Sequence, residues 1–168
     1  LSQTGVDIVV RGEGEETFKE LISLINGNNN YKNILGISYL GNGKFIHNPP
    51  RPFIQNLDDI PPFPYHLFEK NLEKYPNFSG IFGSRGCPYN CTFCSSRSMS
   101  GKKYRYHSVE RVIHEIKILV QKYRQKSVFF MDDNIAVNKK HFKKLCEAIL
   151  KEGLNKEVYF HGSLRGDN

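Results

Sequence analysis

Three short apolar runs in the second half of the chain have the composition of β-strands. They cover residues 79–84 (SGIFGS), 126–131 (KSVFFM) and 157–162 (EVYFHG). Each is short and contains aromatic or β-branched residues, which favour a strand over a helix. The sequence therefore predicts three strands in this part of the chain.

Helical periodicity fills the two intervals between these strands. Residues 138–152 form one predicted helix, which Gly153 ends, and Ser108 is a plausible N-cap for the other. The earlier helix carries apolar residues at helical spacing: Val109, Val112, Ile113, Ile116, Leu119, Val120 and Tyr123. The order strand–helix–strand–helix–strand is typical of the opening of a parallel α/β barrel, whose active-site groups lie at the carboxyl ends of the strands.

A separate strand–helix pair opens the chain. Residues 6–10 (VDIVV) form a β-branched run, and a glycine turn follows it. Apolar residues then repeat at helical spacing: Phe18, Leu21, Ile22 and Ile25. One such unit cannot cover both faces of a parallel sheet, so we expect the rest of its domain to lie upstream.

A hairpin and a proline-rich stretch separate these two regions. Residues 34–40 and 44–47 are the predicted strands, and Gly41-Asn-Gly43 is the turn. Residues 48–64 are rich in proline, which favours extended segments outside a central sheet. We interpret residues 31–76 as a linker that contains a β-hairpin.

Composition restricts the functional classes. The chain has 168 residues and a formal net charge of +7, and it contains no apolar run of roughly 20 residues that could span a bilayer. We expect a cytoplasmic location, because no signal peptide is evident. Basic residues crowd the region after the cysteines, and nucleic acid is a possible partner, although a solvated helix face is the favoured interpretation: Arg97, Lys102, Lys103, Arg105, Arg111, Lys117, Lys122, Arg124 and Lys126.

The spacing of the cysteines carries the candidate chemistry. Cys87, Cys91 and Cys94 fall within eight residues, as Cys-x3-Cys-x2-Cys. Three thiolates can hold three corners of a 4Fe-4S cluster, whereas a full protein cage uses four. The spacing therefore predicts a cluster with one open iron, where chemistry can occur.

Other metal and disulfide chemistries fit these cysteines less well. A structural zinc site needs four ligands, and the nearest later candidate is His107, thirteen residues on. Three adjacent cysteines cannot pair evenly in disulfides. An electron-transfer ferredoxin would need a fourth cysteine, but Cys146 shares a predicted helical face with Phe142, Leu145 and Ile149. Cys146 therefore fits a small buried apolar residue.

The cysteine motif, with Phe93 before its last cysteine, resembles the signature of the radical S-adenosylmethionine (radical SAM) enzymes. Residues 9–18 (VVRGEGEETF) resemble the end of the cobalamin-binding domain that precedes many such cores. The resemblance divides the chain into three parts. Residues 1–30 would end a Rossmann-like cobalamin-binding domain, residues 31–76 would be the linker, and residues 77–168 would form the first half of the radical SAM core.

This resemblance also implies roles for individual residues. Phe93 would lie beside the adenine of SAM, and Asp132 or Asp133 would meet its amino group. The family's common Gly-Gly-Glu form is missing at this strand end, so the choice between the two aspartates stays open, and one of them could instead cap a turn. Arg165 would bind the SAM carboxylate, and Ser163 would lie towards the ribose.

The implied function is reductive cleavage of SAM by a 4Fe-4S cluster, with an electron donor such as flavodoxin or ferredoxin. We expect a cobalamin-linked methyltransferase or a carbon-skeleton-modifying enzyme, with cobalamin bound by the full-length protein. One alternative is a radical SAM transfer RNA methylthiotransferase, although such relatives carry further cysteines upstream and none precedes Cys87 here. Another is a non-catalytic zinc or nucleic-acid-binding module. The family core has six strand–helix units, so we expect this chain to be a truncated form or a fragment.

Overall fold

The computed structural model describes residues 5–24, 30–75 and 78–166. The chain forms two compact units, one of residues 1–55 with 90–101 and the other of residues 56–89 with 102–168. The predicted boundary at residues 76 and 77 lies outside the described residues. The predicted hairpin, which the sequence analysis includes in residues 31–76, belongs to the first unit.

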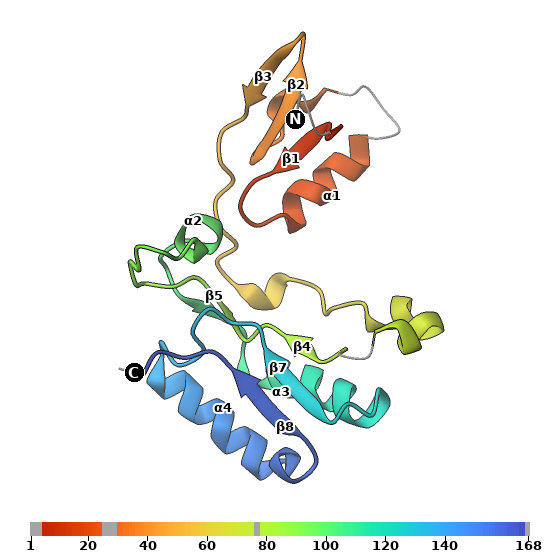
Figure 1. The fold of residues 1–168 in the computed structure, drawn as a ribbon, viewed down its shortest axis with the longest axis vertical. Helices are drawn as coiled ribbons and strands as arrows, with labels where there is room; N and C mark the ends of the chain where they lie inside the picture. The colour runs from red at the N-terminus through yellow and green to blue at the C-terminus, as the bar shows by residue number, and fades with distance from the viewer. Residues whose placement is uncertain (1–4, 25–29, 76–77, 167–168) are drawn as a thin grey trace. The chain divides into compact units, whose positions relative to one another are not determined.

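An antiparallel sheet of three strands forms the first unit. Its strands are β1 (Ile8–Val10), β2 (Ile37–Gly41) and β3 (Lys44–His47), and β2 lies between the other two. Figure 1 shows these strands beside helix α1 (Glu15–Leu24). The opening strand and helix were predicted, but the antiparallel partner of β1 was not.

The hairpin between β2 and β3 confirms the predicted turn. Gly41 pairs with Lys44 in the ladder, so only Asn42 and Gly43 form the loop. Both have positive φ angles, of 50° and 72° respectively. Two left-handed residues in a two-residue loop match the right-handed twist of the flanking strands, which explains why asparagine and glycine occupy these positions.

Helix α1 contributes a small apolar core to the first unit. Leu21 is buried and packs with Ile34 and Ile37. Phe18 and Ile22, which share the predicted stripe, are exposed in the described structure. Ile25, the last residue of that stripe, lies outside the described residues.

The second unit contains the predicted parallel sheet. Strand β7 (Ser127–Phe130) lies between β4 (Gly80–Ile81) and β8 (Tyr159–Gly162), and both pairings are parallel. The single strand predicted over residues 79–84 is wrong in its extent. It divides into β4 and β5 (Ser84–Arg85), and β5 pairs antiparallel with β6 (Arg105–Tyr106), which the sequence did not predict. The division occurs at Gly83, whose N–H donates to a carboxylate and not to a strand.

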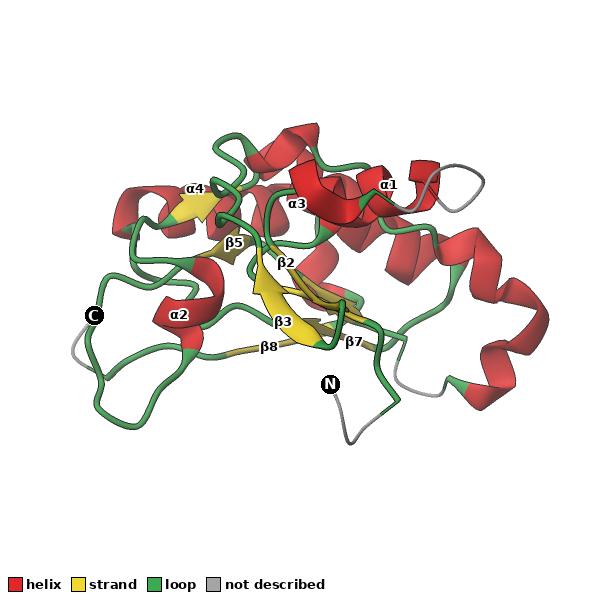
Figure 2. Ribbon diagram, turned by 90° about the horizontal axis from the view of Figure 1, so that it is seen from above, coloured by secondary structure: helices red, strands yellow, loops and turns green. Residues whose placement is uncertain are grey.

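Helices α3 (Val109–Lys117) and α4 (Lys139–Lys151) lie on the same side of β7 and β8 (Figure 2). A π-helical turn over Ile118–Lys122 continues α3. The Ser108 hydroxyl accepts a hydrogen bond from the Arg111 N–H at 3.2 Å, which confirms the predicted N-cap. Gly153 is left-handed, with φ of 72°, and follows the end of α4 as predicted.

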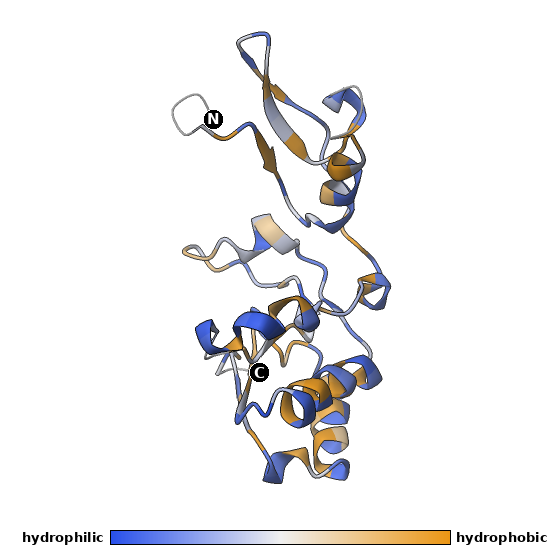
Figure 3. Ribbon diagram, turned by 90° about the vertical axis from the view of Figure 1, so that its right-hand side faces the viewer, coloured by the Kyte–Doolittle hydropathy of each residue, from blue (hydrophilic) through white to orange (hydrophobic). Residues whose placement is uncertain are grey.

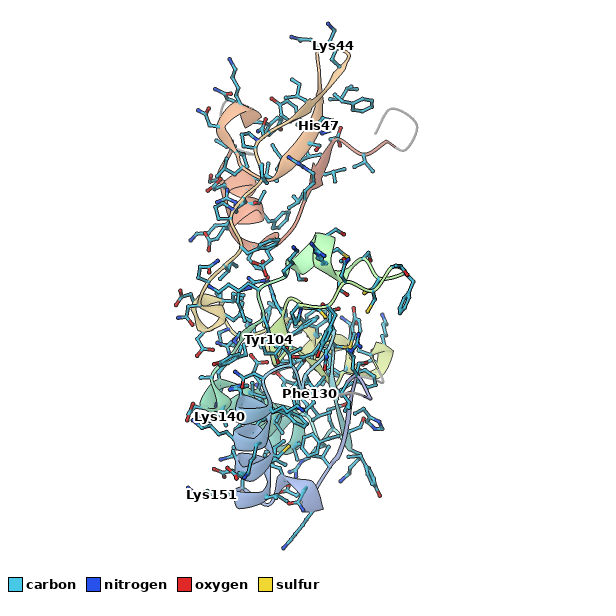
Figure 4. All side chains as sticks on the ribbon, turned by 90° about the vertical axis from the view of Figure 1, so that its left-hand side faces the viewer. Lys44, His47, Tyr104, Phe130, Lys140 and Lys151 are labelled. Atoms are coloured by element: carbon cyan, nitrogen blue, oxygen red, sulfur yellow. The ribbon has the colours of Figure 1, made fainter. Side chains whose placement is uncertain are left out.

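The apolar stripes of these helices face the sheet and form the main core of the second unit. Figure 3 shows apolar and polar residues on different sides of the helices. One of the core residues on the sheet, Phe130, is labelled in Figure 4. Core members include Ile81, Ile116, Leu119, Val128, Phe130 and Leu145. Alternate strand residues point the opposite way, so Phe129, Met131 and Tyr159 are exposed. The helices therefore cover one face of this sheet and leave these side chains on the other.

A short helix, α2 (Ser96–Ser100), follows the last cysteine of the motif and was not predicted. Among the described residues, no helix combines the length and the apolar character that a bilayer crossing requires.

Candidate functional site

The cysteine motif begins directly after β5, in the second unit. Cys87 follows Gly86, which has a φ of 86°, and its side chain is partly buried. The left-handed conformation at Gly86 suits glycine because it has no Cβ. The chain thus turns at the end of β5 and presents the first thiol of the motif.

Cys91 and Cys94 belong to the first unit, where they form a tight turn. The Cys94 N–H donates to the Cys91 carbonyl at 3.2 Å, and Cys94 Sγ lies 3.1 Å from the Ser96 hydroxyl in α2. Phe93, between them, is 91% exposed. Its ring takes no part in the protein core, so it is accessible to a bound molecule.

The donor chemistry of the motif fits an iron–sulfur cluster. None of the three cysteines forms a disulfide, and each is at least partly exposed. Within the described ranges, however, no three Cys, His, Asp or Glu side chains are drawn together as a metal-binding group. Cysteine thiolates are the ligands that such clusters use.

Cys146 is less buried than the sequence predicts for a small packing residue. It follows Leu145, which is buried, on α4, and it is itself partly buried. Burial raises the pKa of the Cys146 thiol. A raised pKa disfavours the thiolate that metal binding requires.

Asp132 lies two residues beyond the end of β7, and its side chain is only 3% exposed. One carboxylate oxygen accepts the Gly83 N–H at 2.9 Å, and the other accepts the Ser84 hydroxyl. Burial raises the pKa of Asp132, although the hydrogen bonds from Ser84 and Gly83 oppose this effect. Both oxygens are therefore engaged inside the second unit.

Asp133, the next residue, is exposed. The structure thus separates the two aspartates that the sequence left equivalent, since one is buried against the chain before Cys87 and the other reaches the surface. Asp133 is therefore the more accessible of the two carboxylates at the carboxyl end of β7.

Arg165 follows β8 and contacts the cysteine motif. Its guanidinium carbon lies 4.0 Å from the centroid of the Tyr89 ring, between Cys87 and Cys91 in the sequence. Ser163 is exposed, and its carbonyl accepts the Ile135 N–H at 3.1 Å. The segments that follow β7 and β8 are thus joined to each other as well as to the motif.

Three residues near the motif were not found from the sequence: Ser84, Tyr89 and Tyr104. The Tyr104 hydroxyl donates to the Ile135 carbonyl at 3.0 Å (Tyr104 is labelled in Figure 4). Their partners are distant in the sequence, so no local spacing could have identified them.

Comparison with known proteins identifies the family. The sequence profile of the radical SAM superfamily matches residues 81–167, which include the whole cysteine motif and the three parallel strands from Ile81 onwards. The match therefore rests on more than the cysteine spacing.

Two curated relatives cover most of the chain. An uncharacterized methyltransferase of Pyrococcus horikoshii is 47% identical over an alignment of 152 residues that covers 89% of this chain and 33% of the relative. The hopanoid C-3 methylase of Methylococcus capsulatus is 32% identical over an alignment of 172 residues that covers 96% of this chain and 30% of the relative. The chain spans about a third of the length of these relatives.

A solved structure has the same fold. The radical SAM methyltransferase TsrM from Kitasatospora setae, with cobalamin and a [4Fe-4S] cluster bound, matches with a TM-score of 0.72 and 18% identity. The alignment covers 93% of this chain and 33% of TsrM. Together with the profile match and the close relatives, the cysteine motif and the parallel α/β sheet assign this chain to the radical SAM superfamily.

Proposed function

We propose that the chain forms part of a cobalamin-linked radical SAM methyltransferase. The observation that carries this proposal is the contact between Arg165 and Tyr89, because it joins a candidate SAM-binding residue to the cysteine motif. The likeness to methyltransferases over nearly the whole chain supports the reaction type.

In this proposal, Cys87, Cys91 and Cys94 would hold a 4Fe-4S cluster as thiolates, one ligand fewer than a full four-cysteine cage, so that SAM could bind as well. The cluster, when bound, supplies the electron that cleaves SAM, and cobalamin would carry the methyl group to the substrate. An electron donor such as flavodoxin or ferredoxin would reduce the cluster.

The polar residues at the strand ends would orient SAM. Asp133 binds the ammonium group, because an exposed carboxylate accepts strong charge-assisted hydrogen bonds from such a donor. Arg165 binds the carboxylate through its planar guanidinium. Phe93 lies beside the adenine, and Ser163 lies towards the ribose.

Cobalamin would bind to a longer form of the protein. The strand–helix pair of β1 and α1 has the order expected at the end of a Rossmann-like cobalamin-binding domain. Apolar residues of this unit line an open pocket of about 400 Å³, which includes Val6, Ile8 and Phe18. Further chain from the same domain would cover these residues.

The test is anaerobic reconstitution with iron and sulfide, followed by electron paramagnetic resonance of the reduced protein with and without SAM. We expect a 4Fe-4S signal that changes when SAM is added. A cluster signal indifferent to SAM would reject the proposed site, and zinc without sulfide would indicate a structural module instead. In the longer form that would bind cobalamin, transfer of label from methyl-labelled SAM to cobalamin tests methyl transfer separately.

A further inference from the structure

The backbone at Gly83 is held from both sides, four residues before Cys87. Its N–H donates to Asp132 at 2.9 Å, and its carbonyl accepts the His107 N–H at 2.9 Å. Asp132 is buried, so water does not compete strongly for its carboxylate. The peptide that leads into the cysteine motif is therefore fixed by partners from two later segments of the chain.

Glycine at position 83 is what permits the carboxylate to approach. A Cβ built on Gly83 would lie 3.3 Å from Asp132 Oδ1 and 3.6 Å from a ring carbon of Phe130. The first distance is shorter than an ordinary van der Waals contact. A larger residue at this position would thus displace the carboxylate or the strand.

The second carboxylate oxygen of Asp132 accepts a hydrogen bond from the hydroxyl of Ser84, which is also buried. Ser84 pairs with Tyr106 across β5 and β6. On the other side, the Tyr104 hydroxyl donates to the Ile135 carbonyl, three residues after Asp132. The segment after β7 is thus joined to β5 and to Tyr104, the residue that precedes β6.

Burying a carboxylate costs free energy unless hydrogen bonds compensate for the lost hydration. Asp132 is compensated by backbone and hydroxyl donors of one short segment, residues 83–84, which leads directly into the cysteine motif. An apolar residue would pack at this position without that cost. The carboxylate is therefore suited to fixing the geometry of this segment.

We propose that Asp132 is a positioning residue for the cysteine motif, which holds Gly83 and Ser84 so that Cys87 is presented at the end of the parallel sheet. In this assignment Asp132 does not touch SAM, and Asp133 alone meets the ammonium group. The claim that Asp132 supports cluster binding rests on the proposed function. The claim that Asp132 fixes the backbone at Gly83 and Ser84 does not depend on it.

The first experiment measures the backbone in the apo form of the chain. Amide hydrogen exchange of the peptide that spans residues 80–88 is compared between the wild type and the variants Ser84→Ala, Asp132→Asn and Asp132→Ala. We expect exchange to accelerate in Ser84→Ala and Asp132→Ala, and to stay nearer the wild type in Asp132→Asn, because the amide oxygen can still accept one hydrogen bond. Unchanged exchange in both alanine variants would overturn the proposal, whatever metal the protein binds.

The second experiment measures iron and sulfide per chain, and SAM affinity, after anaerobic reconstitution. We expect Asp132→Ala to lose cluster several-fold and Asp132→Asn to restore part of it. Asp133→Asn should keep full cluster content. It should bind SAM at least about tenfold more weakly, because it loses a hydrogen bond between charged groups. Full cluster content in Asp132→Ala together with weakened SAM binding would make Asp132 a SAM ligand and would overturn the assignment.

Two controls keep the outcomes distinct. Circular dichroism reports whether Asp132→Ala is folded, and if it is not, Ser84→Ala carries the test because it removes only one hydroxyl. If the wild type takes up no cluster, the proposed function fails. The exchange experiment still decides whether Asp132 fixes the backbone.

Discussion

The guanidinium of Arg165 lies over the ring of Tyr89, with 4.0 Å between the guanidinium carbon and the ring centroid. A guanidinium in such a cation–π contact still has N–H groups at its edge that can bind a carboxylate. Tyr89 lies within the cysteine motif and Arg165 follows β8, so the contact joins two regions that the sequence separates. The position of Tyr89 between two cysteines of the motif did not predict this contact.

Replacing Tyr89 should weaken SAM binding without removing the cluster. We expect Tyr89→Leu to lower SAM affinity about two- to fivefold, because an exposed cation–π contact contributes roughly 0.5–1 kcal/mol. Isothermal titration of the reconstituted protein measures the effect. Tyr89→Phe keeps the ring and is the matched control, so equal losses in both variants would contradict the role of the ring.

Removing a cysteine of the motif should abolish the cluster. Cys91→Ala leaves two thiols, so we expect it to lose most of the iron and sulfide that the wild type binds. Cys146→Ala is the control, because Cys146 packs on α4 and burial raises its pKa. Iron and sulfide analysis after reconstitution measures both. Full cluster content in Cys91→Ala would reject the ligand assignment. Loss of the cluster in Cys146→Ala but not in Cys91→Ala would reject it as well.

Acid should weaken the second unit through Asp58. Its carboxylate accepts hydrogen bonds from His107 Nδ1 and the Ser108 N–H, each at 3.0 Å. Burial raises the pKa of Asp58, but the hydrogen bonds from Ser108 and His107 outweigh it and the pKa falls below the usual 3.8. A carboxylate whose pKa is lower in the folded state than in the unfolded chain stabilises the fold at any pH above the unfolded-state pKa. This stabilisation is lost as the pH falls through the folded-state pKa.

We therefore expect the wild type to lose more stability than Asp58→Asn when the pH falls from about 5 to about 3. Urea unfolding followed by circular dichroism at several pH values measures the difference. Asp7→Asn changes an exposed carboxylate of the first unit and is the control. If Asp58→Asn and the wild type respond equally to acid, the hydrogen bonds at Asp58 contribute nothing to this dependence.

Gly101, directly after α2, should tolerate no side chain. Its φ is 79°, and a Cβ would lie 2.7 Å from a ring carbon of Phe53 in the same unit. We expect Gly101→Ala to destabilise the first unit by about 1–3 kcal/mol, the range for a residue forced into a glycine-only conformation. Thermal unfolding measures it.

Gly43→Ala is the matched control for this substitution. Gly43 also has a positive φ, of 72°, but a Cβ there would meet no atom within 4 Å. Its cost should therefore be smaller. Adding Phe53→Leu to Gly101→Ala should recover part of the loss by removing the ring contact. Equal costs at the two glycines would show that the close approach of Phe53 has no effect.

The local features of this protein could be read from the sequence because neighbouring residues determine them. The apolar spacing predicted the helix that begins after Ser108, and Asn42 with Gly43 predicted the hairpin turn. The spacing of Cys87, Cys91 and Cys94 predicted the family, which the profile match confirms. These features depend on a few residues of chain, so they need no knowledge of the fold.

Contacts between distant residues required the tertiary structure. Asp132 and Asp133 are adjacent and identical in type, yet only Asp132 is buried, because Gly83, 49 residues away, is brought against it by the pairing of β4 with β7. The same holds for the pairing of β1 with β2 and for the contact of Arg165 with Tyr89. Sequence periodicity says which face of an element is apolar. It does not say which elements meet, because that depends on the packing of the whole unit.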